Sequence, residues 1–215
     1  MRQSFTAILV VAVLLPAGVH AQGRAYQRSS YPSLPPFSAG ARLGGAFFTD
    51  SGARDLYDGL LHSGADFKLH FFNLPLAAQT SFDFSGGDGD DPAGLGFTAE
   101  DIDIFLFNWR VSLLLEPPPA YLGDRNFYVQ PYVGGGIGVH FVEEEISSRG
   151  PFFIASESES RSAFGYHAVA GIDFVFASHA SFGVEALYTD AAMDTPLTDH
   201  EVGGFAISAS FKWHF

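Results

Sequence analysis

Hydrophobic and polar residues alternate with a period of two along most of the chain from Phe37 to its end. In the final stretch, GGFAISASFKWHF, apolar side chains occupy the odd positions from Phe205 to Phe215, and polar side chains occupy the even positions from Ser208 to His214. Successive residues of a strand point to opposite faces of a sheet, so this pattern predicts a strand with one apolar and one polar face.

Eight segments of this kind follow one another, and most match or exceed the 9–11 residues that a tilted strand needs to cross a bilayer. Short or proline-bounded turns alternate with longer loops between them. This pattern indicates an antiparallel up-and-down barrel whose last strand closes against the first. The first strand then begins, and the last strand ends, at the periplasmic side, where the short turns lie. The predicted segments are 37–48, 64–72, 76–85, 102–116, 127–142, 162–176, 180–190 and 203–215.

The N-terminal residues have the composition of a secretory signal peptide. Arg2 precedes an apolar run from Phe5 to Leu15, Pro16 follows, and small residues lead to a cleavage site after Ala21. The alternative is a transmembrane anchor, but the apolar run falls short of the ~20 residues that a spanning helix needs. We therefore expect a signal peptide at 1–21, a polar, proline-rich leader at 22–36, and a barrel domain at 37–215.

Composition supports an exported all-β membrane protein. Aromatic residues make up 15% of the chain and charged residues only 16%, whereas a soluble domain carries about 25% charged residues. The chain has no cysteine, which excludes disulfides and thiol chemistry, and its net charge of -13 argues against a nucleic-acid partner. Later segments do not reach the length of a transmembrane helix, so the remaining membrane-spanning structure is a closed β-barrel. The predicted fold is an eight-stranded antiparallel up-and-down transmembrane β-barrel.

Three stretches resemble the small eight-stranded outer-membrane β-barrels of the OmpA, OmpX and OmpW kind: YVQPYVGGGIGVHF, FGYHAVAGIDFVFASHASFGVEALY and the terminal SASFKWHF. The resemblance covers essentially the whole mature chain. It implies a location in the outer membrane of a Gram-negative-type envelope, with outer-membrane lipid and lipopolysaccharide as surroundings. It also implies that Phe211, Trp213 and Phe215 are the signal that the barrel assembly machinery reads. It implies little about activity, because the fold hosts porin-like, adhesive, structural and enzymatic members.

Alternation places a balanced set of charged side chains inside the predicted barrel. Eight strands enclose an interior that side chains just fill, and buried charges are costly unless they are paired. The pattern therefore predicts a plug of ion pairs; the alternative is a narrow or gated channel with Arg110 and Lys212 among its gate charges. The predicted network comprises Arg42, Asp66, Lys68, Asp83, Arg110, Asp173, Glu185 and Lys212. Further inward polar residues are Gln79, Ser81, Asn108, Ser112, Tyr128, Gln130, Tyr132, His140, His167, Ser208 and His214.

The longer loops offer weaker signals. Residues 49–64 predict a short helical turn over the barrel mouth, with Ser51 as its cap. Strands five and six are expected to continue beyond the membrane as a hairpin, whose apolar tip of Phe152, Phe153 and Ile154 is a candidate contact with a surface partner. A weak calcium candidate comprises Asp88, Asp90 and Asp91, which lack the bidentate glutamate of an EF-hand; a solvated acidic loop is the simpler interpretation. We expect no metal and no cofactor.

Two catalytic interpretations fit the sequence poorly. The run GGGIG at 134–138 lacks the Lys-Ser/Thr of a phosphate loop and fits strand curvature instead. A lipid A-modifying enzyme needs serine, histidine and carboxylate together, and the candidates do not form such a motif; they are His140, His167, His200, Ser162 and Glu201. The sequence therefore favours a non-enzymatic barrel that acts in envelope integrity or surface contact. A narrow channel for ions or small solutes is the alternative.

Overall fold

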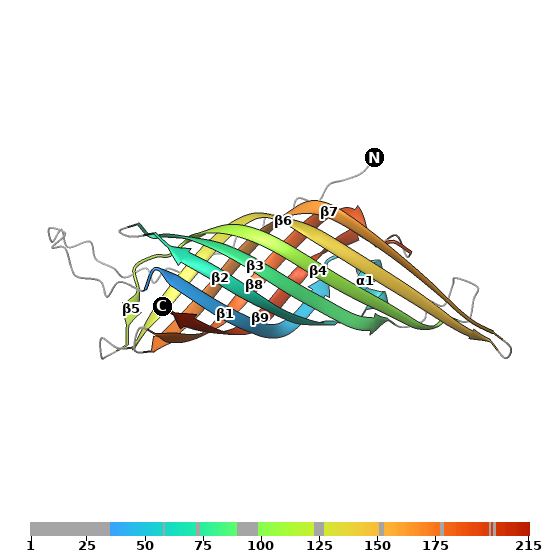
Figure 1. The fold of residues 1–215 in the computed structure, drawn as a ribbon, viewed down its shortest axis with the longest axis horizontal. Helices are drawn as coiled ribbons and strands as arrows, with labels where there is room; N and C mark the ends of the chain where they lie inside the picture. Colours follow the sequence, from blue (N-terminus) through green and yellow to red (C-terminus); the bar gives the residue numbers. More distant parts are fainter. Residues whose placement is uncertain are drawn as a thin grey trace. The chain divides into compact units, whose positions relative to one another are not determined.

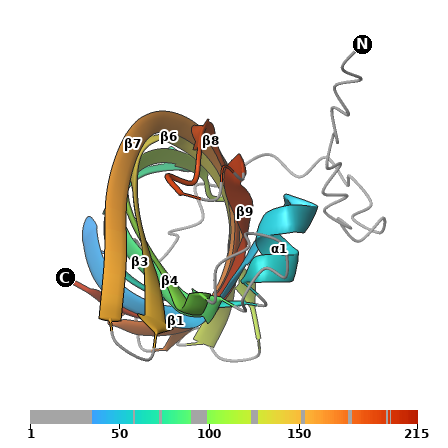
Figure 2. The same cartoon turned by 90° about the vertical axis from the view of Figure 1, so that its right-hand side faces the viewer.

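The computed structural model describes residues 35–57, 59–71, 74–89, 99–122, 127–150, 153–176, 179–197, 199 and 201–215. The predicted signal peptide and most of the predicted leader lie outside these residues. In the described part, eight long antiparallel strands close into a barrel, because β4 pairs with β6 and β9 pairs with β1 (Figures 1 and 2). The strands are β1 (Phe37–Phe48), β2 (Leu60–His70), β3 (Leu76–Gly89), β4 (Ala99–Leu115), β6 (Phe127–Gly150), β7 (Phe153–Phe176), β8 (Ala180–Asp194) and β9 (Glu201–His214).

The first and last strands seal the barrel wall. The amide of Phe37 donates to the carbonyl of Phe215 at 3.2 Å, and the amide of Phe215 donates back at 2.9 Å. Their rings stack with centroids 6.3 Å apart on the outside of the wall. The predicted closure of the last strand against the first is thereby confirmed, and it leaves neither of these strands with an open edge along the paired region.

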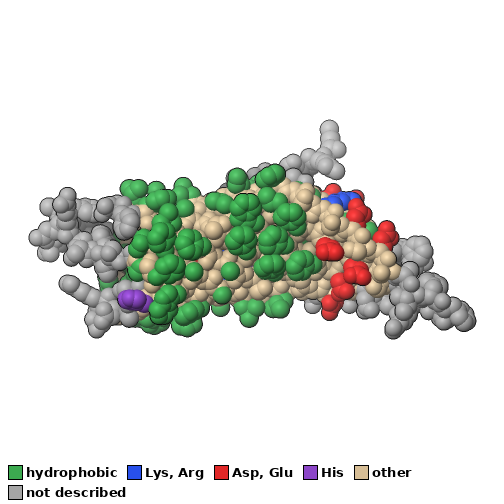
Figure 3. Space-filling model, viewed as in Figure 1, with side chains coloured by type: hydrophobic (Ala, Val, Ile, Leu, Met, Phe, Trp, Pro, Cys, Tyr) green, Lys and Arg blue, Asp and Glu red, His purple; other side chains and the backbone are tan. Residues whose placement is uncertain are grey.

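The two-residue alternation sets which side chains enter the barrel. Along β9, residues at even positions from Ala206 to His214 are buried, whereas those at odd positions from Phe205 to Phe215 are exposed. The outward residues of all strands form an apolar band around the barrel (Figure 3). Such a band, rich in aromatic residues, is the lipid-facing surface of an outer-membrane barrel. The predicted inward and outward faces are confirmed.

Several strands run further than their predicted segments, mainly at one end of the barrel. We call this the loop end, and the opposite end the turn end. The predicted segment 127–142 is part of a 24-residue strand, β6, and 162–176 is part of the equally long β7. These extensions form a hairpin beyond the barrel, as expected. The sequence pattern does not mark their limits, because most side chains on both faces of the extension are polar and the hydrophobic alternation stops there.

Two short elements complete the fold. Helix α1 (Ser51–Leu56) is the predicted helical turn, but its cap is Asp50 and not Ser51: the Asp50 carboxylate accepts from the Ala53 amide at 2.9 Å. Strand β5 (Ala120–Tyr121), which the sequence did not predict, pairs with the start of β6 at the turn end. In the described residues, no helix has the length and apolar character needed to span a membrane.

Candidate functional site

The candidate site is the polar filling of the barrel, and Asp83 lies at its centre. Arg110 donates to this carboxylate from its Nε at 2.7 Å, and the Nε of Arg42 lies 3.2 Å from it. Arg42 also pairs with Asp66 at 3.7 Å and with Glu185. Two guanidinium groups therefore share three carboxylates in this layer.

A second layer, nearer the turn end, contains both lysines of the chain. The ammonium of Lys212 donates to both oxygens of Asp173 at 2.8 Å, and the ammonium of Lys68 lies 3.8 Å from the same carboxylate. Lys68 also donates to Glu116 at 3.0 Å, and His70 contacts the other Glu116 oxygen at 2.8 Å. A cation therefore faces each carboxylate of this layer.

Glu116 was absent from the predicted network, although it follows directly after β4 on the inward parity of Leu114. Burial by itself would raise the pKa of this carboxyl. The hydrogen bond from His70 and the charge of Lys68 outweigh burial and lower the pKa of Glu116 to about 2. The group is therefore ionised at neutral pH and acts as the counter-ion of Lys68.

Tyr132 joins the two layers. Its hydroxyl donates to Glu185 at 2.8 Å and accepts from Lys212 at 3.3 Å. Both lysine ammonium groups also lie over its ring, at 4.3 and 4.7 Å from the centroid, within the range of cation–π attraction. A connected polar network therefore runs through the barrel from Arg110 to His70.

Inward-facing glycines make room for these large side chains. A Cβ atom at Gly138 would lie 2.9 Å from the Arg110 side chain, and a Cβ at Gly40 would lie 2.6 Å from that of Lys212. The same relation holds for Gly64 with Asp83, Gly165 with His140, Gly171 with Tyr132 and Gly183 with Asp173. In the run at 134–138, a Cβ at Gly134, Gly136 or Gly138 would lie 2.7 Å or less from a backbone carbonyl of β4, so these positions let the two strands approach closely.

An apolar cluster closes the loop end above the ion pairs. Ala53 and Leu56 of α1 pack with inward residues of β4 and β6, including Ile104 and Val142. The cluster is held by Glu144, whose carboxylate accepts from the Tyr57 hydroxyl and from the Leu197 amide. We call Ala53, Leu56, Tyr57, Ile102, Ile104, Leu106 and Val142 the roof.

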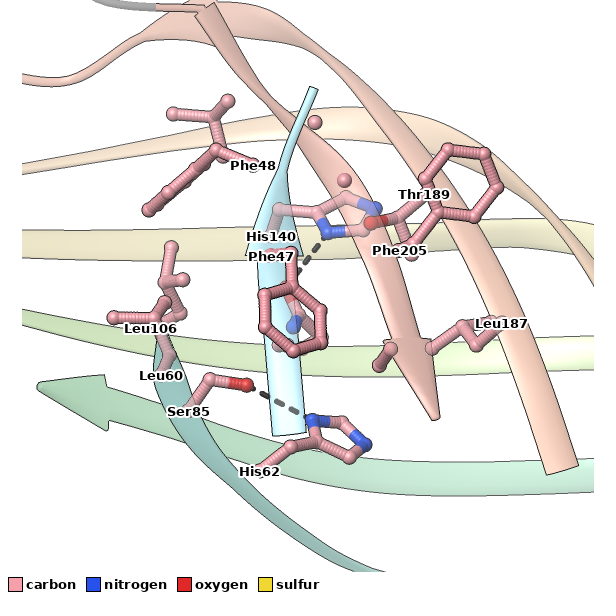
Figure 4. Close-up of a pocket in the computed structure, with 16 residues that line it drawn as sticks. Phe47, Phe48, Leu60, His62, Ser85, Leu106, His140, Leu187, Thr189 and Phe205 are labelled. Carbon is pink, nitrogen blue, oxygen red and sulfur yellow. Dashed lines mark hydrogen bonds between the residues drawn. The ribbon is translucent and has the colours of Figure 1, made fainter. Parts of the chain in front are cut away.

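The space between roof and network is small. A cavity of about 50 Å³ lies there, lined by His62, Ser85, Asn108, His140 and neighbouring apolar residues (Figure 4). It holds only a few water molecules. His62 contacts Ser85 at 2.9 Å, and His140 contacts Asn108 at 2.7 Å. His62 also lies 3.6 Å from the Asp83 carboxylate through its Nε2, so Ser85, His62 and Asp83 lie side by side in the interior, each at most 3% exposed.

The structure places all eight predicted network residues in the interior, each at most 5% exposed. The remaining predicted site residues lie elsewhere. Phe211, Trp213 and Phe215 face outward on β9 and beyond it. Asp88 is exposed, and Asp90 and Asp91 lie outside the described residues. Phe152 also lies outside them, whereas the backbone of Phe153 and Ile154 pairs with Gly150 and Arg149.

Five residues of the network and of the contacts that hold the roof escaped the sequence analysis as site residues: His62, His70, Glu116, Tyr57 and Glu144. The inward parity of β2 and β4 would have found the first three. The contact between Tyr57 and Glu144 joins a loop to a strand 87 positions away, and no local pattern signals it. In the described residues, no group of three or more His, Cys, Asp or Glu side chains is arranged to hold a metal ion.

Comparisons with known proteins give a consistent result. The family model for the outer membrane protein beta-barrel domain matches residues 7–215. The solved structure of Neisserial surface protein A is similar, with a TM-score of 0.54 at 12% identity, covering 84% of this chain and 97% of that one. OprG from Pseudomonas aeruginosa gives 0.51 at 18% identity, covering 83% and 95%. Ail of Yersinia pestis gives 0.48 at 16% identity, covering 83% and 95%. No curated protein matches the chain.

Proposed function

Because the chain belongs to the outer membrane protein beta-barrel domain family and lies in the outer membrane, we propose that it is a sealed barrel without enzymatic turnover. Its role is in envelope integrity and in contacts at the cell surface. Outer-membrane lipid and lipopolysaccharide surround its apolar band. The loop end faces outward, as is usual for barrels of this kind.

The connected ion-pair network carries this proposal. Asp83, Asp173 and Glu185 are each held by at least one cationic side chain inside a bore that side chains already fill. Removing one partner from a buried ion pair costs roughly 3–5 kcal/mol, so an open state that breaks these pairs is rarely populated. The roof blocks the same bore a second time at the loop end.

Single-channel conductance of the protein in a planar bilayer tests the seal. We expect no openings in the wild type and steady leakage in Arg110→Ala, because this change removes the largest fully buried side chain of the network. Arg54→Ala is the matched control, since it removes an exposed arginine of α1 outside the bore. Discrete openings in the wild type would contradict the seal and favour the narrow channel, with Arg110 as part of its gate.

A further inference from the structure

The hairpin of β6 and β7 has one edge without a partner strand among the described residues. β7 pairs with β6 from Phe153 onward, but with β8 only from Gly165 onward. β8 itself ends at Asp194, and its ladder to β9 shifts register between Asp190 and Asp194. Residues 153–164 of β7 thus form a sheet edge with unpaired backbone groups, which we call the β7 edge.

The β7 edge projects beyond the apolar band. Its described side chains from Ser156 to Ser162 are all exposed, and they spell SESESRS. Glu157, Glu159 and Arg161 lie on one face of the strand, while the serines lie on the other. Arg161 donates to the Pro196 carbonyl in the loop after β8 at 3.1 Å, and its Nε also lies 3.7 Å from the half-exposed Glu159 carboxylate. Two exposed glutamates at alternate positions therefore border the edge.

The surrounding surface is strongly acidic (Figure 3). Seven exposed carboxylates and a single guanidinium lie on the described part of the sheet beyond the band. The carboxylates belong to Asp88, Asp103, Glu143, Glu145, Glu157, Glu159 and Glu201, and the guanidinium to Arg161. A second copy of the chain brings the same excess of negative charge and is repelled, whereas a cationic segment is attracted.

We propose that the β7 edge binds an extended segment of a partner protein that carries Lys or Arg at alternate positions. Strand addition supplies backbone hydrogen bonds to the edge. The Cβ atoms of the cationic residues then lie about 4.5–5.5 Å from those of Glu157 and Glu159, which lets the opposite charges meet. This inference deepens the surface-contact part of the proposed function and rests on it for its cellular meaning. The binding event itself does not require a sealed bore.

A synthetic nine-residue peptide that alternates Lys with Thr tests the proposal, with the protein refolded into lipid nanodiscs. We expect binding by fluorescence anisotropy and slower amide exchange at residues 156–164. Loss of both charges in Glu157→Gln/Glu159→Gln weakens binding about three- to tenfold, as expected for two exposed ion pairs. A peptide that alternates Lys with Pro keeps the charge but cannot add a strand, so it does not bind comparably.

The matched control is Glu143→Gln/Glu145→Gln, which removes two exposed charges from β6 away from the edge. Equal weakening by both double variants would mean general electrostatic attraction and would overturn the proposal. Equal binding of the Lys-Pro peptide, no binding at all, or dimerisation of the protein through β7 would overturn it as well. The Arg110→Ala variant separates the two proposals. If the wild type conducts ions, but the wild type and Arg110→Ala both still bind the peptide, the proposal of a sealed bore is wrong and the proposal of binding at the β7 edge stands.

Discussion

Large charged side chains in the lumen lie over glycines of neighbouring strands. Gly64 lies beside Asp83, Gly138 beside Arg110, and Gly40 beside Lys212. Side chains already fill the interior of an eight-stranded barrel. A long side chain therefore fits only where the paired residue on the neighbouring strand has no side chain. The charges and glycines therefore form one packing unit, in which neither can be changed without disturbing the other.

At the residue level, we expect Gly138→Ala to destabilise the barrel by about 1–3 kcal/mol, the usual cost of overpacking. The new Cβ would lie 2.7 Å from the Trp109 carbonyl and 2.9 Å from the Arg110 side chain. Urea unfolding in lipid vesicles measures the loss. Gly45→Ala is the control, because its Cβ meets nothing closer than 3.5 Å; equal losses in both variants would contradict the packing argument.

Asp83 is the carboxylate that two arginines share, so its charge matters more than that of a surface acid. Asp83→Asn leaves Arg42 and Arg110 with less compensating charge, and we expect a loss of roughly 3–5 kcal/mol in unfolding free energy. Glu159→Gln, which removes a half-exposed carboxylate paired with Arg161, should cost less than about 1 kcal/mol. The same urea titration compares the two variants, and similar losses would argue against a network centred on Asp83.

Among the elements, α1 is tied to the rest of the roof through its C-terminal neighbour. Tyr57 donates to the buried Glu144 carboxylate, which also accepts from the Leu197 amide at 2.7 Å. Three separate segments meet at this one carboxylate. The helix and loop part of the roof is therefore fastened to β6 through Glu144, and its order depends on a small number of polar contacts.

Tyr57→Phe tests this dependence. Loss of a hydrogen bond to a charged group costs about 1.5–3 kcal/mol, so we expect the amides of Arg54 and Tyr57 to exchange at least about tenfold faster with solvent. Amides in the middle of β4 should keep their protection. Tyr166→Phe removes an outward hydroxyl bound to Asp190 and serves as the control. Unchanged exchange in α1 would show that apolar packing alone holds the roof.

The sequence predicted the elements wherever one face of a strand meets lipid. There, the alternation from Phe205 to Phe215 or from Phe67 to Phe71 determines both strand and register, since a slip of one residue would turn charges such as Lys68 and Lys212 toward the bilayer. Beyond the apolar band that constraint ends. The start of β7, the capping role of Asp50 and the Tyr57–Glu144 contact depend on pairing and packing between distant segments, which local periodicity does not contain.

Closure of the barrel depends on the pairing of its first and last strands, β1 and β9. At its end, Phe37 and Phe215 are joined by two backbone hydrogen bonds. The ring of Phe215 also packs near that of Phe67, with their centroids 6.3 Å apart. Because these hydrogen bonds use main-chain atoms, we expect the barrel to close without the Phe215 ring. We propose that the barrel assembly machinery recognises Phe211, Trp213 and Phe215, so we expect its recognition to be lost when that ring is removed.

Phe215→Ala should therefore separate folding of the barrel from its insertion into the outer membrane of cells. We expect near-normal refolding in detergent, seen as heat-modifiable migration on gels, but a severalfold lower amount in the outer-membrane fraction of cells. Phe67→Ala removes another ring of the same aromatic group without touching the terminal residue. If both variants lose the same amount in cells, then packing of the aromatic group, and not a terminal signal, explains the loss.

The placement of both lysines inside the barrel has a practical consequence. Lys68 and Lys212 are each 1% exposed, and the chain has no other lysine. Amine-reactive esters and isotopic acylation reagents therefore cannot modify a lysine side chain of the intact molecule. Surface-labelling surveys of whole cells would overlook its lysines entirely. In a purified sample, conversely, every acylated lysine marks a molecule that was open when the reagent arrived, so mass spectrometry of two peptides gives a direct count of the misfolded fraction.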